Sequence, residues 1–348
     1  MDECALSPEQ KNLVGADAET SAAPASVAVV VVFRECSGFV DQCLDAIQRM
    51  EGGPWPLIMV PDKFVPEYEG RGTQIPFVGT IAAKRNRGIA AAADDCKYIA
   101  FVDSDAYPTP SWLAQVCARF SQMDRRTAAI TGPNLTPPQD SLLRRVPGLA
   151  IESKLIMGEG AFRFTNQGAT EIDNFSYATT CNLVVRRDVL QEIGGFNKKL
   201  LTAEDVGLCD AMIGRGYRIF YDPTIIVYHH RRDLFRFWLQ HFNEGLHVKY
   251  YLNFTHIRRR PVFFPSLLVI GELLIGLAGH WWLFLGLLQA AQLLVYFLDR
   301  RRAAGTTGKA ALAAVSMWGF LKAYGLGGIL SFVGGDKFYL SSRHDPDN

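Results

Sequence analysis

The apolar run Tyr98–Val102 sets the strongest limit on the fold of this chain, because it has the length and composition of a buried strand. It ends at Asp103 and Asp105, and the prolines at 108 and 110 prevent the strand from continuing. Two carboxylates so close together repel each other and cost desolvation. A divalent cation between them and a phosphate would make the pair tolerable, since oxygen ligands suit Mg²⁺ or Mn²⁺. A solvated acidic turn is the commoner explanation of an isolated Asp-x-Asp, so other segments of the chain have to decide between such a turn and a metal site.

Strand and helix patterns alternate before this run. Val27–Phe33 is typical of a parallel strand buried on both faces, and Val40–Met50 has helical spacing. Two short strands, Pro56–Val60 and Ile75–Val78, and a helix, Ile81–Ala93, are expected next. The alternation predicts a doubly wound α/β domain.

Polar side chains follow these strands and open the helix before the central strand. They are Arg34, Glu35, Asp62, Lys84, Arg85, Asp103 and Asp105. Ligands bind at the carboxyl ends of strands in open α/β sheets. Acceptors for a base and a ribose, cations for a diphosphate and a carboxylate pair for a metal would suit a nucleoside diphosphate. The chain has no Gly-x-Gly-x-x-Gly after its first strand and no Gly-x-x-x-x-Gly-Lys-[Ser/Thr], which argues against a Rossmann dehydrogenase and a P-loop ATPase.

The second half predicts a strand over Thr179–Arg187, a helix over Asp188–Ile193 and a helix that carries Glu204 and Asp205 and runs to Arg215. Thr202 can cap this last helix, with Asp205 as the partner in a capping box, and this explanation of Asp205 has the same weight as catalysis.

Two strands close this part of the chain, Arg218–Tyr221 and Ile225–Tyr228. The second runs into His229, His230 and two arginines, for which an exposed basic turn is the alternative to a site.

Composition narrows the function classes. The net charge is +1, so no global field favours nucleic acid. The seven cysteines are scattered without a Cys-x-x-Cys pair, which predicts reduced thiols in a cytosol. The polar, acidic start through Ala25 predicts a loosely ordered tail and no signal peptide.

The C-terminal part is apolar. Glu272 is the one formal charge between Val262 and Leu298, a stretch long enough for two membrane spans with a break at Gly279-His280. Ala310–Val333 either spans or lies in the interface, and we favour spanning. The arginines that flank the two spans, at 258–260 and 300–302, place the large N-terminal domain in the cytoplasm by the positive-inside rule.

Seven motifs, in this order, resemble a family 2 glycosyltransferase of the GT-A fold over Val27–Arg232: VVVFREC, IMVPDK, AAKRNRG, YIAFVDSDAYPTPSWL, TTCNLVVRRDVL, IGGFNKKLLTAEDVGL and GYRIFYDPTIIVYHHRR. Phe237–Gly245 and Ala323–Gly327 are similar to segments of the integral-membrane subgroup, which includes enzymes like the succinoglycan glucosyltransferases that extend lipid-linked glycans for exopolysaccharides.

The resemblance implies a role for each site residue. Nucleotide-sugar contacts would come from Arg34, Glu35, Asp62, Lys84, Arg85, Asp103 and Arg231. Mn²⁺ or Mg²⁺ would be held by Asp105, Asp103 and His229, with His230 as the alternative imidazole. Asp205, paired with Glu204, would deprotonate the acceptor hydroxyl, and Gln240 and His241 would contact the acceptor.

The chain departs from the family pattern after Asp205, where Gly207 and Asp210 replace an acid and an arginine. Asn243-Glu244 stands where processive polymerases carry an arginine, which favours the addition of one sugar.

The sequence therefore predicts a disordered tail over 1–25, a GT-A domain over 26–233, an amphipathic interfacial helix region over 234–260, a membrane domain of two to three spans over 261–334 and a polar tail over 335–348. The expected enzyme inverts the anomeric carbon and moves one sugar from a nucleotide sugar to a polyprenyl-diphosphate-linked glycan at the inner membrane. The alternatives are a polyprenyl-phosphate glycosyltransferase, a processive synthase, or a membrane scaffold without activity. A soluble acceptor and an ordinary amphipathic core helix over Phe235–Tyr251 also stay open.

Overall fold

The computed structural model describes residues 27–172, 178–249, 252, 263–279 and 282–334. The two predicted tails lie outside these residues, as do the arginines at 258–260 and His280 at the predicted break.

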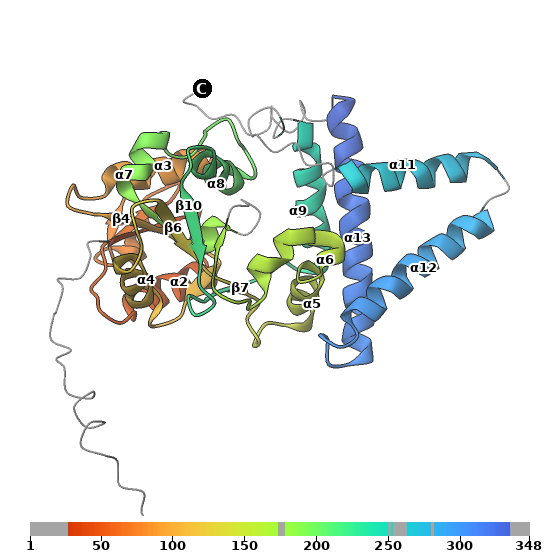
Figure 1. Cartoon of the computed structure of the whole chain (residues 1–348), viewed down its shortest axis with the longest axis horizontal. Coiled ribbons are helices and arrows are strands. Elements are labelled where there is room, and N and C mark those ends of the chain that lie inside the picture. The colour runs from red at the N-terminus through yellow and green to blue at the C-terminus, as the bar shows by residue number, and fades with distance from the viewer. Residues whose placement is uncertain (1–26, 173–177, 250–251, 253–262, 280–281, 335–348) are drawn as a thin grey trace, which may run out of the picture.

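A mixed sheet forms the centre of the N-terminal part (Figure 1). It has eight strands, in the order β3-β2-β1-β4-β9-β6-β10-β8. Its strands are β1 (Val27–Val32), β2 (Leu57–Val60), β3 (Thr73–Gln74), β4 (Tyr98–Phe101), β6 (Thr127–Thr131), β8 (Thr170–Ile172), β9 (Leu183–Arg186) and β10 (Arg218–Tyr221). β9 runs antiparallel to both β4 and β6, and β8 runs antiparallel to β10. The predicted α/β sheet is therefore confirmed, and it is mixed.

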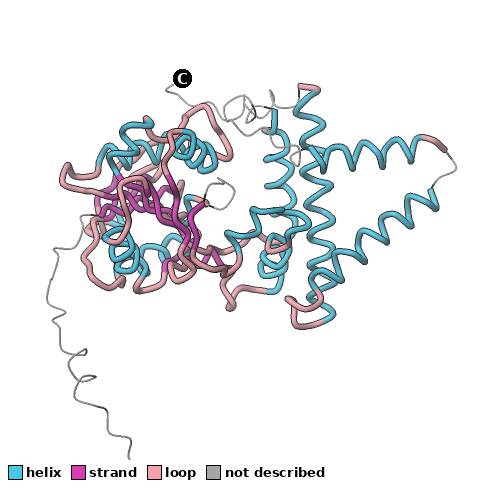
Figure 2. The backbone as a smooth tube through the Cα atoms, in the orientation of Figure 1, coloured by secondary structure: helices cyan, strands magenta, loops and turns pink. Residues whose placement is uncertain are grey.

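Helices cover both faces of this sheet (Figure 2). They are α2 (Gly38–Gln48), α3 (Ile81–Ala91), α4 (Trp112–Ser121), α7 (Arg187–Ile193) and α8 (Glu204–Gly214). Val29 and Val31 of β1 join the core with α2 and α4, whereas Ala28 and Val30 join the core with α3, α7 and α8. This alternation follows from the two-residue period of a strand and explains why β1 is apolar throughout.

A second, three-stranded sheet lies beyond the carboxyl end of β4, in the order β5-β11-β7. Its strands are β5 (Ala106–Pro108), β7 (Asn134–Leu135) and β11 (Val227–His229). β5 and β11 are antiparallel and pair Ala106 with His229.

Three local predictions are wrong. Ile75–Val78 is not a strand, because Pro76 has no N–H to donate, although Ile75 and Phe77 still donate to the carbonyls of Met59 and Pro61. Thr180–Asn182 forms a 3₁₀ turn (η4) before β9. Ala203, not Thr202, is the N-cap of α8, with φ 56°, and among the described residues no side chain caps this end.

The C-terminal part is helical. After α5 (Leu142–Ile151), α6 (Lys154–Met157) and η2 (Gly158–Phe164) come α9 (Leu234–Leu246), α11 (Phe264–Leu277), α12 (Trp282–Arg300) and α13 (Thr307–Phe332). Within the described residues, α12 and α13 are long and apolar enough to cross a membrane, and α11 is shorter. The apolar face of α9 packs against α13, so this face is not free for lipid.

Candidate active site

Asp103 and Asp105 lie directly after β4, at the carboxyl edge of the sheet, as the residues around them predict. The small sheet brings the end of β11 beside them, because the His230 N–H donates to the Asp105 carbonyl at 3.0 Å. The His229 Nε2 atom consequently lies 3.1 Å from Asp105 Oδ1.

Arg85 of α3 connects this pair of acids to a second pair. Its guanidinium donates to Asp103 Oδ1 at 2.7 Å and to Glu204 Oε1 at 2.6 Å. The arginine is 5% exposed, and its guanidinium lies over the ring of Phe196. Glu204 and Asp205 begin α8, so one buried cation brings two acidic motifs from distant parts of the chain to one place.

The electrostatics of the two acidic pairs differ. Burial alone would raise the pKa of Asp105, but the charge and hydrogen bond of His229 and the charge of Arg232 outweigh it and lower the pKa to about 2. Burial, together with the nearby charge of Asp205, raises the pKa of Glu204 to about 7 in spite of Arg85. We expect the pKa of Glu204 to be raised because the single positive charge of Arg85 is shared among Asp103, Glu204 and Asp205.

His229 has a defined tautomer. Arg231 donates to its Nδ1 atom at 2.8 Å, and an arginine cannot accept a hydrogen bond, so the proton of the neutral ring lies on Nε2, toward Asp105. Arg231 is buried and held by the carbonyl and side chain of Asn134 at 2.6 and 2.8 Å. Burial lowers the pKa of Arg231 to about 10. The alternative imidazole, His230, is committed to Asp140 at 2.6 Å and to Gln42 at 2.8 Å.

The other predicted nucleotide contacts surround the same edge. Lys84 is buried and forms an ion pair with Asp62, and it donates to the Phe33 carbonyl at 2.5 Å. Arg34 and Glu35 are exposed in the loop after β1. Lys84 and Arg85 thus both bind protein carboxylates, and a contact of either with a diphosphate stays a prediction.

The predicted acceptor contacts lie elsewhere, on α9. Gln240 and His241 both hydrogen-bond Glu244, at 3.0 and 2.7 Å. The His241 ring is buried between Phe237 and Phe320 in the packing of α9 against α13. Both side chains are thus engaged by Glu244, and a contact of either with the acceptor stays a prediction.

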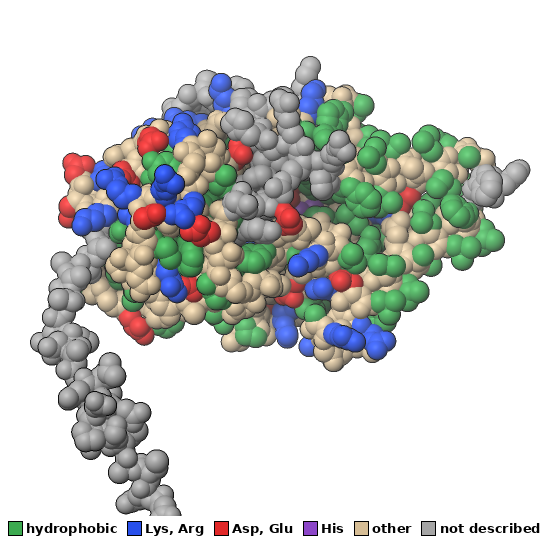
Figure 3. Space-filling view, in the orientation of Figure 1, with side chains coloured by type: hydrophobic (Ala, Val, Ile, Leu, Met, Phe, Trp, Pro, Cys, Tyr) green, Lys and Arg blue, Asp and Glu red, His purple; other side chains and the backbone are tan. Residues whose placement is uncertain are grey.

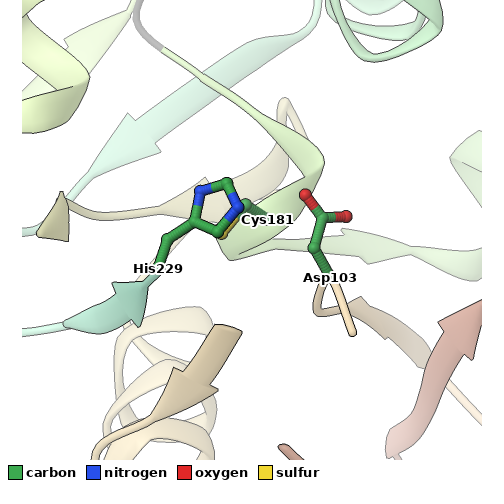
Figure 4. Close-up of side chains that lie close together, drawn as sticks. All are labelled: Asp103, Cys181 and His229. Carbon is green, nitrogen blue, oxygen red and sulfur yellow. The ribbon is translucent and has the colours of Figure 1, made fainter. Parts of the chain in front are cut away.

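Among the residues that the structure describes, one group of side chains has the spacing of a metal site, and Figure 4 shows it: Asp103, Cys181 and His229, whose ligand atoms all lie within 4.8 Å of one another. Burial raises the pKa of Cys181 well above its usual range, so this side chain stays a thiol and is a poor ligand for a hard cation. The predicted ligand His229 has both ring nitrogens engaged, Nδ1 by Arg231 and Nε2 by Asp105, so the donors left are the carboxylates of Asp103 and of the neighbouring Asp105. This set fits Mn²⁺ or Mg²⁺.

Two residues that shape the site carry no strong sequence signal. Ala203 is the one non-glycine residue with a positive φ among those that the structure describes, and it stands directly before Glu204. Asn182 is fully buried, accepts from Trp112 Nε1 at 2.9 Å and donates to the carbonyls of Ile225 and Pro133. A polar residue inside the apolar motif TTCNLVV is the signal that could have singled out Asn182.

Known proteins resemble this chain in sequence and in fold. Residues 78–194 match the profile of the family described as Glycosyl transferase family 2. The pre-mycofactocin glycosyltransferase of Mycobacterium tuberculosis is 29% identical over 158 residues, which cover 45% of this chain and 32% of that protein. An uncharacterized protein of Sinorhizobium fredii, y4gI, is 25% identical over 158 residues, covering 43% of this chain and 16% of its own length. The chain thus matches about a third or less of the length of these relatives.

A solved structure with a similar fold is the mannosyltransferase PcManGT from Pyrobaculum calidifontis, in complex with GDP-Man and Mn²⁺. It is 14% identical, with a TM-score of 0.54, and the match covers 84% of this chain and 86% of that one. This similarity concerns the fold.

Proposed function

We propose that this chain, which contains a family 2 glycosyl transferase domain on a GT-A fold, transfers a sugar from a nucleoside diphosphate donor to an acceptor hydroxyl. The observation that carries the proposal is the junction made by Arg85. It joins the Asp103–Asp105 edge, suited to a metal and a diphosphate, to the Glu204–Asp205 pair, suited to a base.

Asp105 and Asp103 would hold the divalent cation, which would supply positive charge to offset the charge that develops on the departing diphosphate, and His229 would orient Asp105. The strongly acidic Asp105 stays ionised at any physiological pH, as a ligand must. PcManGT, in complex with GDP-Man and Mn²⁺, supports a metal and a nucleotide sugar, and we propose both for this chain. Arg34, Glu35 and Asp62 would contact the nucleoside.

Asp205 takes the proton of the acceptor hydroxyl while its oxygen bonds the anomeric carbon and the bond to the diphosphate breaks. Glu204, fixed by Arg85, positions this end of α8 and thereby Asp205. One base and no enzyme nucleophile give inversion at the anomeric carbon. A product of retained configuration, measured by NMR, would overturn this step.

The acceptor we propose is a polyprenyl-diphosphate-linked glycan at the cytoplasmic face of the inner membrane. In support, α9 follows directly from β11, which carries His229, and α9 packs along the apolar α13. The proposed units are a catalytic domain over 26–233, a connecting helix region over 234–260 and a membrane domain over 261–334. A transferase acting on polyprenyl phosphate, or a processive synthase, is the second candidate, and a ladder of products on a gel would favour the synthase over the addition of a single sugar.

The test is a screen of the purified protein with UDP-, GDP- and dTDP-sugars, with Mn²⁺, Mg²⁺ or EDTA. We expect one donor to be consumed with metal and none with EDTA.

Asp205→Asn should lower transfer by about 10²–10⁴-fold while donor binding persists. Asp105→Asn should remove metal-dependent donor binding. The matched control is Asp188→Asn, whose half-exposed carboxylate on α7 pairs with Arg125. Unchanged transfer in both site variants would contradict the proposal.

A further inference from the structure

α13 is packed lengthwise against α9 of the connecting region and against α5 of the proposed catalytic domain. α9 runs beside it: Trp238 Nε1 donates to the Ser316 carbonyl at 3.2 Å, and further along, the Lys249 N–H donates to Ser331 Oγ at 3.3 Å. Between these points Gly245 touches Gly327. Helix α5 adds Ala150 and Ile151 to the same core.

This packing is hard to combine with a membrane crossing by α13. α9 would have to enter the hydrocarbon with it, together with the charges of Arg236 and Glu244 and the exposed backbone of its ends. Because the short loop 230–233 joins α9 to β11, the catalytic sheet would follow. An orientation of α13 along the membrane surface avoids both costs.

α11 and α12 behave differently, because they project from α13 as an arm (Figure 1) that is covered with hydrophobic side chains (Figure 3). Exposure is greatest toward the tip, where Leu277 is 82%, Leu283 is 78% and Trp282 is 67% exposed. Such a surface needs an apolar environment. α11 has 14 residues and is therefore about 21 Å long, which is less than the roughly 30 Å of the hydrocarbon core.

Both ends of the arm are fastened to the same body. At the start of α11, Ser266 Oγ donates to the Gly325 carbonyl of α13 at 3.2 Å. At the end of α12, Asp299 accepts from Ser153 Oγ at 2.6 Å, and Arg300 donates to the Leu149 carbonyl at 3.3 Å. The arm therefore leaves the body and returns to it.

Charged and polar groups meet between α13 and the middle of the two arm helices. Lys322 of α13 forms an ion pair with Glu272 of α11 and donates to Gln292 of α12 at 2.9 Å. Arg301 and Arg302, just after α12, are exposed. Arg301 and Arg302 suit anionic lipid headgroups, and the pairing of Lys322 with Glu272 offsets the two charges that lie along the arm.

We propose that α11 and α12 form a re-entrant hairpin that dips into the anionic leaflet from the side of the catalytic domain and returns to that side, while α13 and α9 lie in the plane of the interface. The proposal rests on membrane attachment and not on the reaction. The hairpin does not cross the membrane, whereas the topology that the sequence favours crosses it two or three times.

The experiment labels single added cysteines in the full-length chain with a membrane-impermeant maleimide, in inside-out and right-side-out vesicles, and reads each site by peptide mass spectrometry. Ala303→Cys lies in the exposed loop after α12 and reports the catalytic side. Ala278→Cys lies at the tip, and Val333→Cys lies at the exposed end of α13. We expect the Ala278→Cys variant to react from neither side until detergent is added, and the Val333→Cys variant to react from the same side as the Ala303→Cys variant.

Labelling of the tip from the opposite side would show two crossings, and labelling from the catalytic side would show a tip outside the bilayer; either result overturns the hairpin. Labelling at 333 from the opposite side, or from neither side, overturns the in-plane placement of α13. If carbonate released the unmodified protein, the membrane attachment on which the hairpin depends would be refuted. A negative donor screen would instead refute the proposed function and would not bear on the topology.

Discussion

Arg85 holds three elements together through two short ion pairs, so its loss should lower both the stability and the activity of the protein. Arg85→Ala leaves Asp103 and Glu204 without their shared cation, and removing one partner of a buried pair costs about 3–5 kcal/mol. We expect a clear fall in the unfolding temperature. Arg125→Ala is the control, since its ion pair with Asp188 is exposed and worth at most about 1 kcal/mol. Equal effects of the two substitutions would contradict the buried junction.

Glu204 should make stability depend on pH. Its pKa is about 7 in the folded chain against 4.5 for an ordinary glutamate, so between these values the folded state holds a proton that the unfolded state has released. Stability then falls as pH rises through this window, by at most about 1.4 kcal/mol per pH unit. Glu204→Gln cannot titrate, so its stability relative to the unmodified chain should increase from pH 5 to pH 7 in denaturant titrations. A constant difference over this range would show that the pKa is not raised.

At the scale of elements, α9 and α13 touch through glycines. A Cβ at Gly327 would lie 2.2 Å from the Phe242 carbonyl oxygen, so the two helix backbones would have to separate. Gly327→Ala should therefore destabilise the chain by about 1–3 kcal/mol. Gly286→Ala in α12 meets nothing within 4 Å and should gain up to about 1 kcal/mol from helix propensity. Thermal unfolding of both variants in the same detergent gives the comparison, and a neutral Gly327→Ala would argue against this packing.

The start of α8 shows how an element positions a site without a capping side chain. Ala203 takes a left-handed conformation that costs about 1–2 kcal/mol for a residue with a Cβ atom, and the next two residues are Glu204 and Asp205. The ion pair with Arg85 and the packing of Leu208 and Met212 in the core offset this cost. Capping rules read from Thr202 and Asp205 could not foresee it, because they consider the helix alone.

At the scale of the whole molecule, the apolar arm should decide where the protein resides. Leu283→Asp puts a charge at its exposed tip, and a carboxylate within the bilayer costs about 2.5–3.5 kcal/mol. We expect the variant to be released from membranes by carbonate more readily than the unmodified chain. Phe64→Asp alters an equally apolar, 53% exposed side chain of the N-terminal part and should leave the release by carbonate unchanged. Equal release of both variants would mean that the arm does not enter lipid.

The sequence by itself determined several strands and helices of the N-terminal part, among them β1, β4, β10, α2 and α3, whereas it did not predict β6 or α4. Tyr98–Phe101 and Arg218–Tyr221 form strands as their composition predicts, and Asp103 and Asp105 stand at the strand end where they were expected. These features depend on neighbours along the chain, so local periodicity and the absence of a proline N–H suffice to predict them.

Only the tertiary structure decided which groups meet. Arg85 and Glu204 are 119 positions apart, and Asp105 and His229 are 124 apart, so no pattern along the chain could have shown that they form ion pairs or hydrogen bonds. The same holds for α9, whose apolar face could be read from its periodicity, but whose partner, α13 and not lipid, could not. Periodicity shows that a face must be covered, and only packing in three dimensions determines what covers it.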